Sequence, residues 1–127
     1  ADDRTPIRYA GMDGFAPTAT FSLVEAAARL SRSGSDRVFV GSIVTSGLFY
    51  DPDPKTFDKW RSLGHLGVEM EAAMLYTIAA VKGVEALAMM TVSDVLAPDA
   101  EPIRIGDAEL KAGVDQMMRI ACDVAVG

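Results

Sequence analysis

The chain has 127 residues, and half of them are apolar, which is enough for one domain with a hydrophobic core. The net charge of −6 and the scattered basic residues argue against a nucleic-acid-binding surface, which needs clustered Lys and Arg. The single cysteine, Cys122, excludes an intramolecular disulfide and fits a reducing compartment. Because no apolar run is long enough to cross a bilayer and no signal-peptide pattern opens the sequence, we expect a soluble, cytoplasmic protein.

The first third of the sequence predicts a lead-in followed by one helix. Residues 1–14 mix Asp, Arg, Pro and Gly, so we expect an extended segment with one possible strand at residues 7–10. Ser22 and Glu25 have the spacing of a capping box, with Ser22 as the N-cap. This pattern predicts a structural helix that ends near residues 31–34.

The next segment predicts a strand, a turn and a short helix. Residues 37–46 are rich in β-branched and aromatic residues, which favours a strand. Gly41 inside it indicates a close backbone approach or a bulge. Downstream, Asp53 can cap a helix with Pro54 in its first position, and this helix is expected to run to about Leu63.

Residues 70–81 are apolar on nearly every face, which predicts a buried helix that ends at Gly83. Two carboxylates, Glu69 and Glu71, fall in its first turn, where free N–H groups and the positive end of the helix dipole tolerate them best. Charge placement alone leaves two interpretations open. The pair either complements the helix dipole or points into a pocket.

The apolar run at residues 84–92 predicts a central strand that ends in Ser93 and Asp94. Ligands of open α/β sheets bind beyond the carboxyl ends of such strands, which favours the pocket interpretation. A loop at residues 95–102 follows, and Gly106 then opens a last helix in whose apolar pattern Cys122 is expected to be buried.

His65, the only histidine, is expected to have no catalytic role, because no Ser or Cys nucleophile pattern accompanies it.

Several motifs in order carry a resemblance to a known family. The sequence VEMEAA at residues 68–73, followed downstream by TVSD at residues 91–94, resembles the bacterial, hexameric type of purine nucleoside phosphorylase. VGS at residues 40–42 and LFYDPD at residues 48–53 resemble the strand and the base-stacking loop of the same family. The similarity runs from about Phe15 to the C-terminus.

The resemblance implies a fold and an assembly. The fold is α/β, a three-layer sandwich with a mixed sheet flanked by helices. Residues 1–127 are expected to form the C-terminal part of a single phosphorylase domain whose N-terminal half is absent, because family members are about twice as long. That half would be supplied by the same or another polypeptide. The resemblance also implies a homo-oligomer, a hexamer in which a neighbouring subunit helps to close the site.

Cleavage of an N-glycosidic bond develops positive charge on the sugar and negative charge on the departing base. An ionised carboxylate can hold the ribose hydroxyls, and a buried, protonated acid can donate to the base. Glu71 at the helix start suits the first role, and Asp94 after the predicted strand suits the second. The resemblance implies the same catalytic pair, with Glu71 on the ribose 2′ and 3′ hydroxyls and Asp94 facing N7 and the 6-substituent of the purine.

The resemblance also implies the reaction and the remaining substrate contacts. A purine (deoxy)ribonucleoside and inorganic phosphate would give the free base and (deoxy)ribose 1-phosphate, with no metal and no cofactor. Phe49 would pack on the purine, Ser93 would flank it, and Val68, Glu69 and Met70 would line the sugar and base, with Tyr50 as a further candidate. No Gly-rich or Arg-rich anion site is recognisable, so the phosphate ligands are expected from the absent half.

The sequence departs from the family in one place. An arginine usually stands near the start of the last helix and assists the aspartate, but Leu110 occupies that position here. Arg104 is a possible auxiliary residue in its place, and the preference between 6-oxo and 6-amino purines stays open. Two alternatives remain: a methylthioadenosine or adenosylhomocysteine type of nucleosidase, which uses water, and a non-catalytic nucleoside-binding module.

Overall fold

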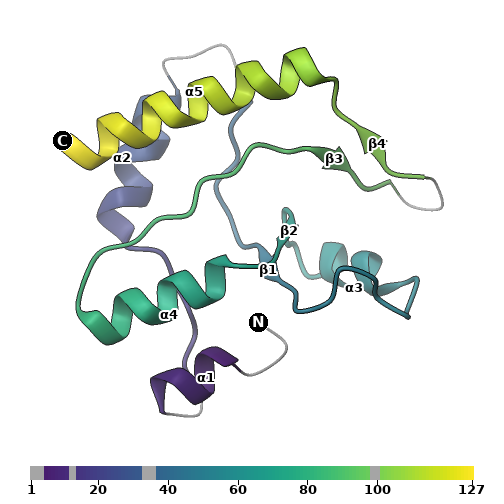
Figure 1. Cartoon of the computed structure of the whole chain (residues 1–127), viewed down its shortest axis with the longest axis horizontal. Coiled ribbons are helices and arrows are strands. Elements are labelled where there is room, and N and C mark those ends of the chain that lie inside the picture. The colour runs from purple at the N-terminus through teal and green to yellow at the C-terminus, as the bar shows by residue number, and fades with distance from the viewer. Residues whose placement is uncertain (1–4, 12–13, 33–36, 98–100) are drawn as a thin grey trace. The chain divides into compact units, whose positions relative to one another are not determined.

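Helices and short strands follow one another along the chain, as the α/β prediction requires (Figure 1). In this computed structural model the described residues are 5–11, 14–32, 37–97 and 101–127. The chain divides into two units, of which unit 1 comprises residues 1–24 and 39–88 and unit 2 comprises residues 25–38 and 89–127. The predicted helix end at residues 33–34 and the middle of the predicted loop, residues 98–100, lie outside the described residues.

Unit 1 begins with helix α1 (Thr5–Ala10), so the strand that we expected at residues 7–10 is wrong. Proline is well tolerated in a first helical turn, because its ring presets the helical φ and the missing N–H would have no partner there, and Pro6 takes such a position. The helix packs beside α4 (Ala72–Lys82). A contact with a helix so far along the chain cannot be predicted from the local sequence of residues 7–10.

Two short parallel strands form the centre of unit 1. β1 (Val44–Thr45) pairs with β2 (Val68–Glu69), with Val44 opposite Val68, and the Ser46 N–H continues the ladder to the Glu69 carbonyl at 2.8 Å. The strand predicted for residues 37–46 is therefore confined to its end. Residues 39–41 are exposed and pair with no strand among the described residues.

Gly41 was predicted to mark a close backbone approach or a bulge, and the structure shows that the side chain of Leu66 lies against it. A Cβ atom on Gly41 would lie 2.6 Å from Cδ1 of Leu66. The Leu66 N–H donates to the carbonyl of Ser42 at 2.9 Å, so the two chain segments are already in register here. A side chain at this position would require the exposed side chain of Leu66 to move.

Helix α3 (Thr56–Ser62) begins later than the predicted Pro54. Asp53 shapes the turn before the helix, because its Oδ1 accepts the Lys55 N–H at 2.9 Å and its carbonyl accepts the Thr56 N–H at 3.2 Å. The aspartate therefore closes a turn of its own, as Asp side chains commonly do, and does not cap the helix.

Helix α4 (Ala72–Lys82) ends at Gly83, whose φ of 66° is left-handed, and this end was predicted correctly. One face of α4 is buried through small residues and Thr77. The opposite side carries Leu75, Ile78 and Val81, which are 40–50% exposed. The apolar pattern predicted a helix that is buried on nearly every face. Only one face is buried, because no described residue of unit 1 covers the other.

The segment at residues 84–92 contains no strand, so the predicted central strand is wrong. Its polar groups bond elsewhere: Ala86 exchanges two hydrogen bonds with Thr20, each of 2.9 Å, and the Ala88 N–H donates to the hydroxyl of Tyr76 at 2.9 Å. A strand requires a ladder partner, which an apolar run does not provide by itself.

Helix α2 (Phe21–Ser31) begins one residue before Ser22, so the predicted capping box is wrong. The carbonyl of Thr20 accepts the Val24 N–H at 3.1 Å, which marks the helix start. The hydroxyl of Ser22 instead donates to Glu85 at 2.8 Å. The Ser22 side chain, which was predicted to cap the helix, therefore bonds to a residue far along the chain.

Unit 2 contains a small hairpin and a long helix. β3 (Asp94–Val95) pairs antiparallel with β4 (Ile103–Arg104), and α5 (Asp107–Val126) follows β4 (Figure 1). Gly106 precedes α5, as predicted. A Cβ atom on Gly113 would lie 2.7 Å from Cγ2 of Thr91, so α5 packs closely on the segment before β3.

The inward side of α5 is a narrow stripe, and Cys122 lies outside it. The stripe residues are half-buried or buried, and they are Leu110, Gly113, Gln116, Met117, Ile120, Ala121 and Val124. Cys122 is exposed, so the predicted buried thiol is wrong. Its apolar neighbours in sequence point to other sides of the helix, because a helix turns 100° per residue. No helix among the described residues is long and apolar enough to cross a membrane.

Candidate active site

The first turn of α4 is capped by the carboxylate of Glu69. Its Oε2 accepts the Glu71 N–H at 2.7 Å and the Ala72 N–H at 2.6 Å. The first N–H groups of a helix have no partner within the helix, and the positive end of the helix dipole favours a negative charge beside them. Glu69 therefore fulfils the dipole-complementing interpretation that the sequence left open.

Thr45 links this cap to the neighbouring strand. Its hydroxyl donates a short hydrogen bond to Glu69 Oε1 and accepts the Ala73 N–H at 3.0 Å. The residue is buried and lies at the carboxyl end of β1. Through Thr45 and Glu69, the ends of both parallel strands are fastened to the start of α4.

Glu71 also lies at the start of α4, but its carboxylate does not cap the helix. It is the residue just before α4, it is exposed, and it makes no side-chain bond to the helix start. No hydrogen bond or ion pair joins its carboxylate to any residue that the structure describes. We had expected the helix start to hold Glu71, whereas Glu69 takes that place and leaves Glu71 free to meet a ligand.

An aromatic pair follows the carboxyl end of β1. Phe49 and Tyr50 meet edge to face, with ring centroids 4.9 Å apart, and they are 74% and 87% exposed. The preceding turn is closed by Ser46, whose Oγ accepts the Leu48 N–H at 3.1 Å. Ligands of α/β proteins bind at the carboxyl ends of parallel strands, and β1 and β2 both end here.

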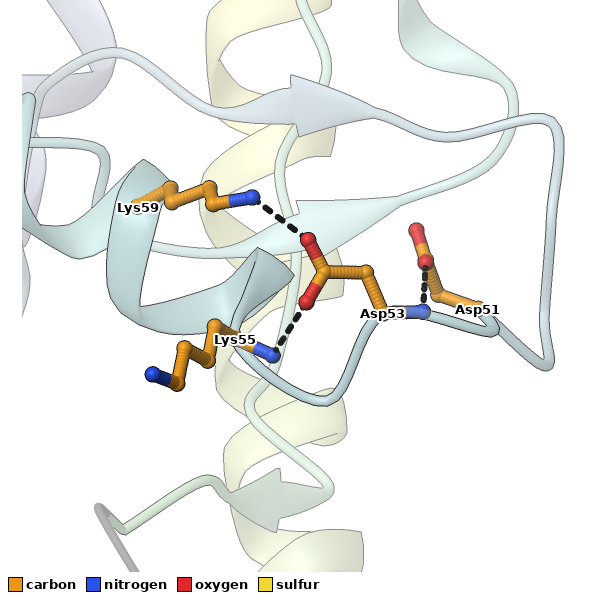
Figure 2. A network of polar contacts seen from close by, with 4 residues as sticks. All are labelled: Asp51, Asp53, Lys55 and Lys59. Atoms are coloured by element: carbon orange, nitrogen blue, oxygen red, sulfur yellow. Dashed lines mark hydrogen bonds and ion pairs between the residues drawn. The ribbon is translucent and has the colours of Figure 1, made fainter.

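The loop after the aromatic pair is held by a chain of polar contacts, shown in Figure 2. The Asp53 N–H donates to Asp51 Oδ1 at 2.8 Å, and Asp53 Oδ2 pairs with the Lys59 ammonium at 2.5 Å. The hydrogen bond from Lys59, with that from the Lys55 N–H, lowers the pKa of Asp53 below its ordinary value. The same contact raises the pKa of Lys59.

In unit 2, Asp94 and its partners lie on the hairpin. Asp94 Oδ2 accepts the Ser93 hydroxyl at 2.7 Å, and Arg104, directly opposite on β4, has its Nη1 3.9 Å from Asp94 Oδ1. The Asp94 side chain is 39% exposed, although we had expected burial to protonate it. The expectation rested on a central strand before Asp94 that the described residues do not form.

Leu110 lies half-buried in the first turns of α5 and belongs to the stripe that packs inward. At the position where the resemblance predicts an arginine, the chain therefore has a residue that contributes to packing. Arg104 comes from β4 rather than from the last helix, and its guanidinium is the cation that the structure brings to Asp94 in unit 2.

The predicted site residues therefore form two groups. Unit 1 brings together Glu69, Glu71, Val68 and Met70 around the ends of its parallel strands, with the aromatic pair just after β1, and unit 2 brings together Ser93, Asp94 and Arg104. Val68 and Met70 are partly exposed at 36% and 41%.

Thr45 was missed by sequence reasoning. A β-branched residue is ordinary in a strand, and no local pattern distinguished its hydroxyl. His65, predicted to have no catalytic role, has a buried Nδ1 without a hydrogen-bond partner in the described part of the chain. Among the described residues, no group of three or more His, Cys, Asp or Glu side chains has the arrangement of a metal site.

Comparison with known proteins identifies the family. Residues 3–125 match the family model described as the phosphorylase superfamily. The chain belongs to the phosphorylase superfamily. Within it, the chain is 42% identical over 120 residues to the DeoD-type purine nucleoside phosphorylase of Exiguobacterium sp., covering 94% of this chain and 49% of the relative.

Two further relatives from the phosphorylase superfamily bear the same type of name. The DeoD-type purine nucleoside phosphorylase of Clostridium beijerinckii is 50% identical over 88 residues, which cover 69% of this chain and 37% of the relative. The DeoD-type 2 enzyme of Vibrio cholerae is 37% identical over 120 residues, which cover 94% and 49%. The chain thus spans about half the length of the curated relatives it matches.

Proposed function

We propose that this chain provides the nucleoside-binding part of a purine nucleoside phosphorylase. The proposal rests chiefly on Glu71, an unpaired carboxylate at the carboxyl ends of two parallel strands, beside an exposed aromatic pair. The names of the relatives support the same activity. The reaction would convert a purine (deoxy)ribonucleoside and inorganic phosphate into the free base and (deoxy)ribose 1-phosphate.

On the sugar side, Glu71 would accept hydrogen bonds from the ribose 2′ and 3′ hydroxyls. Its negative charge would also stabilise the oxocarbenium character that the sugar gains as the glycosidic bond lengthens. The segment from Val68 to Met70 would line the sugar and base, and Phe49, with Tyr50 beside it, would stack on the purine. Their exposure in this chain supports such a role, because rings that are 74% and 87% exposed leave aromatic surface available to a base.

On the base side, a protonated Asp94 would donate a proton to N7 of the purine, so that the base leaves neutral. Ser93 and Arg104 contact Asp94 and would orient it. Asp94 is partly exposed in this chain, whereas a carboxylic acid that donates to a leaving group usually lies in a site closed to water. We therefore expect the rest of the fold, or a neighbouring subunit, to cover it during catalysis.

The phosphate would attack C1′ of the sugar from a site outside the described residues. The start of α4, the kind of place where anions bind, is filled by the Glu69 carboxylate. The other half of the fold, in the same or another polypeptide, would supply the phosphate ligands. It would complete a three-layer sandwich by covering apolar residues such as Leu75 and Ile78, and a hexamer in the cytoplasm would be the working form. The proposed reaction uses phosphate as its co-substrate and no metal or cofactor.

The test is base release from inosine and adenosine with and without phosphate, after mass spectrometry has established which polypeptides are present. Phosphate-dependent release with ribose 1-phosphate as product is the expected result. Release without phosphate would instead make the protein a nucleosidase. Purine binding without release by a preparation that contains both halves would make it a binding module.

A further inference from the structure

The start of α4 is held by two side chains whose carboxylate and hydroxyl groups have no assigned part in the proposed bond cleavage. Three consecutive N–H groups, those of Glu71, Ala72 and Ala73, are satisfied by Glu69 and Thr45. The hydroxyl of Thr45 also donates to the Glu69 carboxylate, so the two side chains form one connected network. All of these bonds lie within unit 1.

We infer that Thr45 and Glu69 are positioning residues, which hold the backbone of Glu71 so that its carboxylate meets the sugar hydroxyls. The inference rests on the proposed function, because it takes Glu71 as the sugar-binding group. It assigns to the Glu69 carboxylate a task within the protein: Oε1 accepts from Thr45, and Oε2 accepts from two backbone N–H groups.

The geometry explains why such support is effective. Glu71 lies between β2 and α4, and its own N–H is one of the three groups held. A carboxylate whose backbone is fixed loses less conformational freedom when it binds two hydroxyls, and a misplaced one binds them poorly. Thr45 also stands one residue before Ser46, which shapes the turn toward Phe49. Thr45 is therefore adjacent in sequence to the residue that shapes the aromatic turn.

The test compares Thr45→Val, which keeps the shape and removes the hydroxyl, with Thr45→Ser, which keeps the hydroxyl. The matched control is Thr77→Val. Thr77 is fully buried in the same helix and donates to the Ala73 carbonyl at 2.6 Å, but it bonds to none of the three capped N–H groups and to neither Thr45 nor Glu69. Each variant is used as the full chain together with whatever polypeptide the wild type requires for activity.

The first measurement is phosphate-dependent base release from inosine and from 2′,3′-dideoxyinosine, which lacks both hydroxyls. Thr45→Val should lower kcat/KM for inosine about tenfold or more, and should change the value for the dideoxy substrate much less. Thr45→Ser should restore most of the loss, and Thr77→Val should affect both substrates alike. If Thr45→Val lowers kcat/KM equally for the two substrates, the inference is overturned. A purely structural defect would lower kcat/KM whether or not the substrate carries the hydroxyls.

The second measurement is amide hydrogen exchange at Ala72 and Ala73, which needs no turnover. Exchange at Ala73 should be faster in Thr45→Val than in the wild type and in Thr77→Val; unchanged exchange would overturn the inference. If Thr45→Val does not unfold cooperatively, Glu69→Gln takes its place, with the same substrate dependence expected. Inactivity of the wild type on both nucleosides would refute the proposed function alone, since the exchange result still decides whether the network exists.

Discussion

The two parts of the candidate site are held in different ways. Around Glu71, hydrogen bonds of Thr45 and Glu69 join β1 and β2 to the start of α4, and the Glu71 carboxylate takes no part in them. Asp94 lies on a hairpin of two short strands, partly exposed, with Arg104 3.9 Å away. The group proposed to bind the sugar is thus positioned by hydrogen bonds within its own unit, whereas the group proposed to bind the base depends on what covers it.

This difference has an energetic basis. A buried hydrogen bond that satisfies an otherwise orphaned N–H prevents a desolvation penalty of about 1–3 kcal/mol. An exposed ion pair such as that of Arg104 contributes about 0–1 kcal/mol, because water screens it. We therefore expect substitutions around Glu71 to act mainly by changing the position of its carboxylate. Substitutions at Asp94 should act mainly by changing proton transfer to the base.

The largest effect is expected at Asp94. Replacing Asp94 with Asn removes the proton donor while it keeps the size of the side chain. The rate of base release should fall about a hundredfold, the range typical of a lost general acid, while binding of the nucleoside changes little. Single-turnover rates and equilibrium binding of inosine measure the two quantities. Equal turnover by the mutant would remove Asp94 from the mechanism.

The second effect separates the two glutamates that precede α4. Glu69→Ala should lower the free energy of unfolding by about 2 kcal/mol, because it uncaps the helix and leaves N–H groups unsatisfied. Glu71→Ala should change it by less than about 0.5 kcal/mol, because no described residue bonds to its carboxylate, and yet it should abolish most of the activity. Denaturant melts of both variants, with assays beside them, measure the contrast. A large loss of stability in Glu71→Ala would contradict the assignment.

A smaller effect is expected at Arg104. Arg104→Met keeps the length of the side chain and removes the cation beside Asp94. Base release should fall less than in Asp94→Asn, by about tenfold or less, with stability nearly unchanged since the pair is exposed. The matched control is Arg119→Met on α5, a residue in no ion pair among the described residues. If both variants keep full activity, Arg104 does not replace the family arginine.

The smallest effect is a pH dependence of stability from Asp53. Its pKa is lower in the folded chain than in the unfolded chain, so the stabilisation is complete above the unfolded value of about 3.9 and is lost as the pH falls through the folded value. Lys59→Met should weaken this acid-side loss. Lys55→Met should largely keep it, because Lys55 bonds to Asp53 through its backbone N–H and its side chain points away from the carboxylate (Figure 2). Melts between about pH 2 and 6 measure the difference; identical profiles in all three proteins would contradict it.

Local patterns predicted some elements well and failed where a distant partner decided. The helix predicted over residues 70–81 forms as α4 over residues 72–82 and ends at Gly83 as predicted, because apolar composition and a left-handed glycine act within a few residues. The close approach at Gly41 was also predicted. The strand expected at residues 84–92 failed, because Thr20 and Tyr76 take its backbone groups.

The sequence by itself determined the family, through the order and spacing of its motifs, and it singled out Glu71 and Asp94 as the acids to consider. Only the tertiary structure decided which glutamate is free. Thr45 is 24 residues from Glu69 and 28 from Ala73, and such contacts leave no local pattern in the chain. A periodicity records which side of an element is apolar. A hydrogen bond depends on where two distant backbones meet, and that position is set by the fold as a whole.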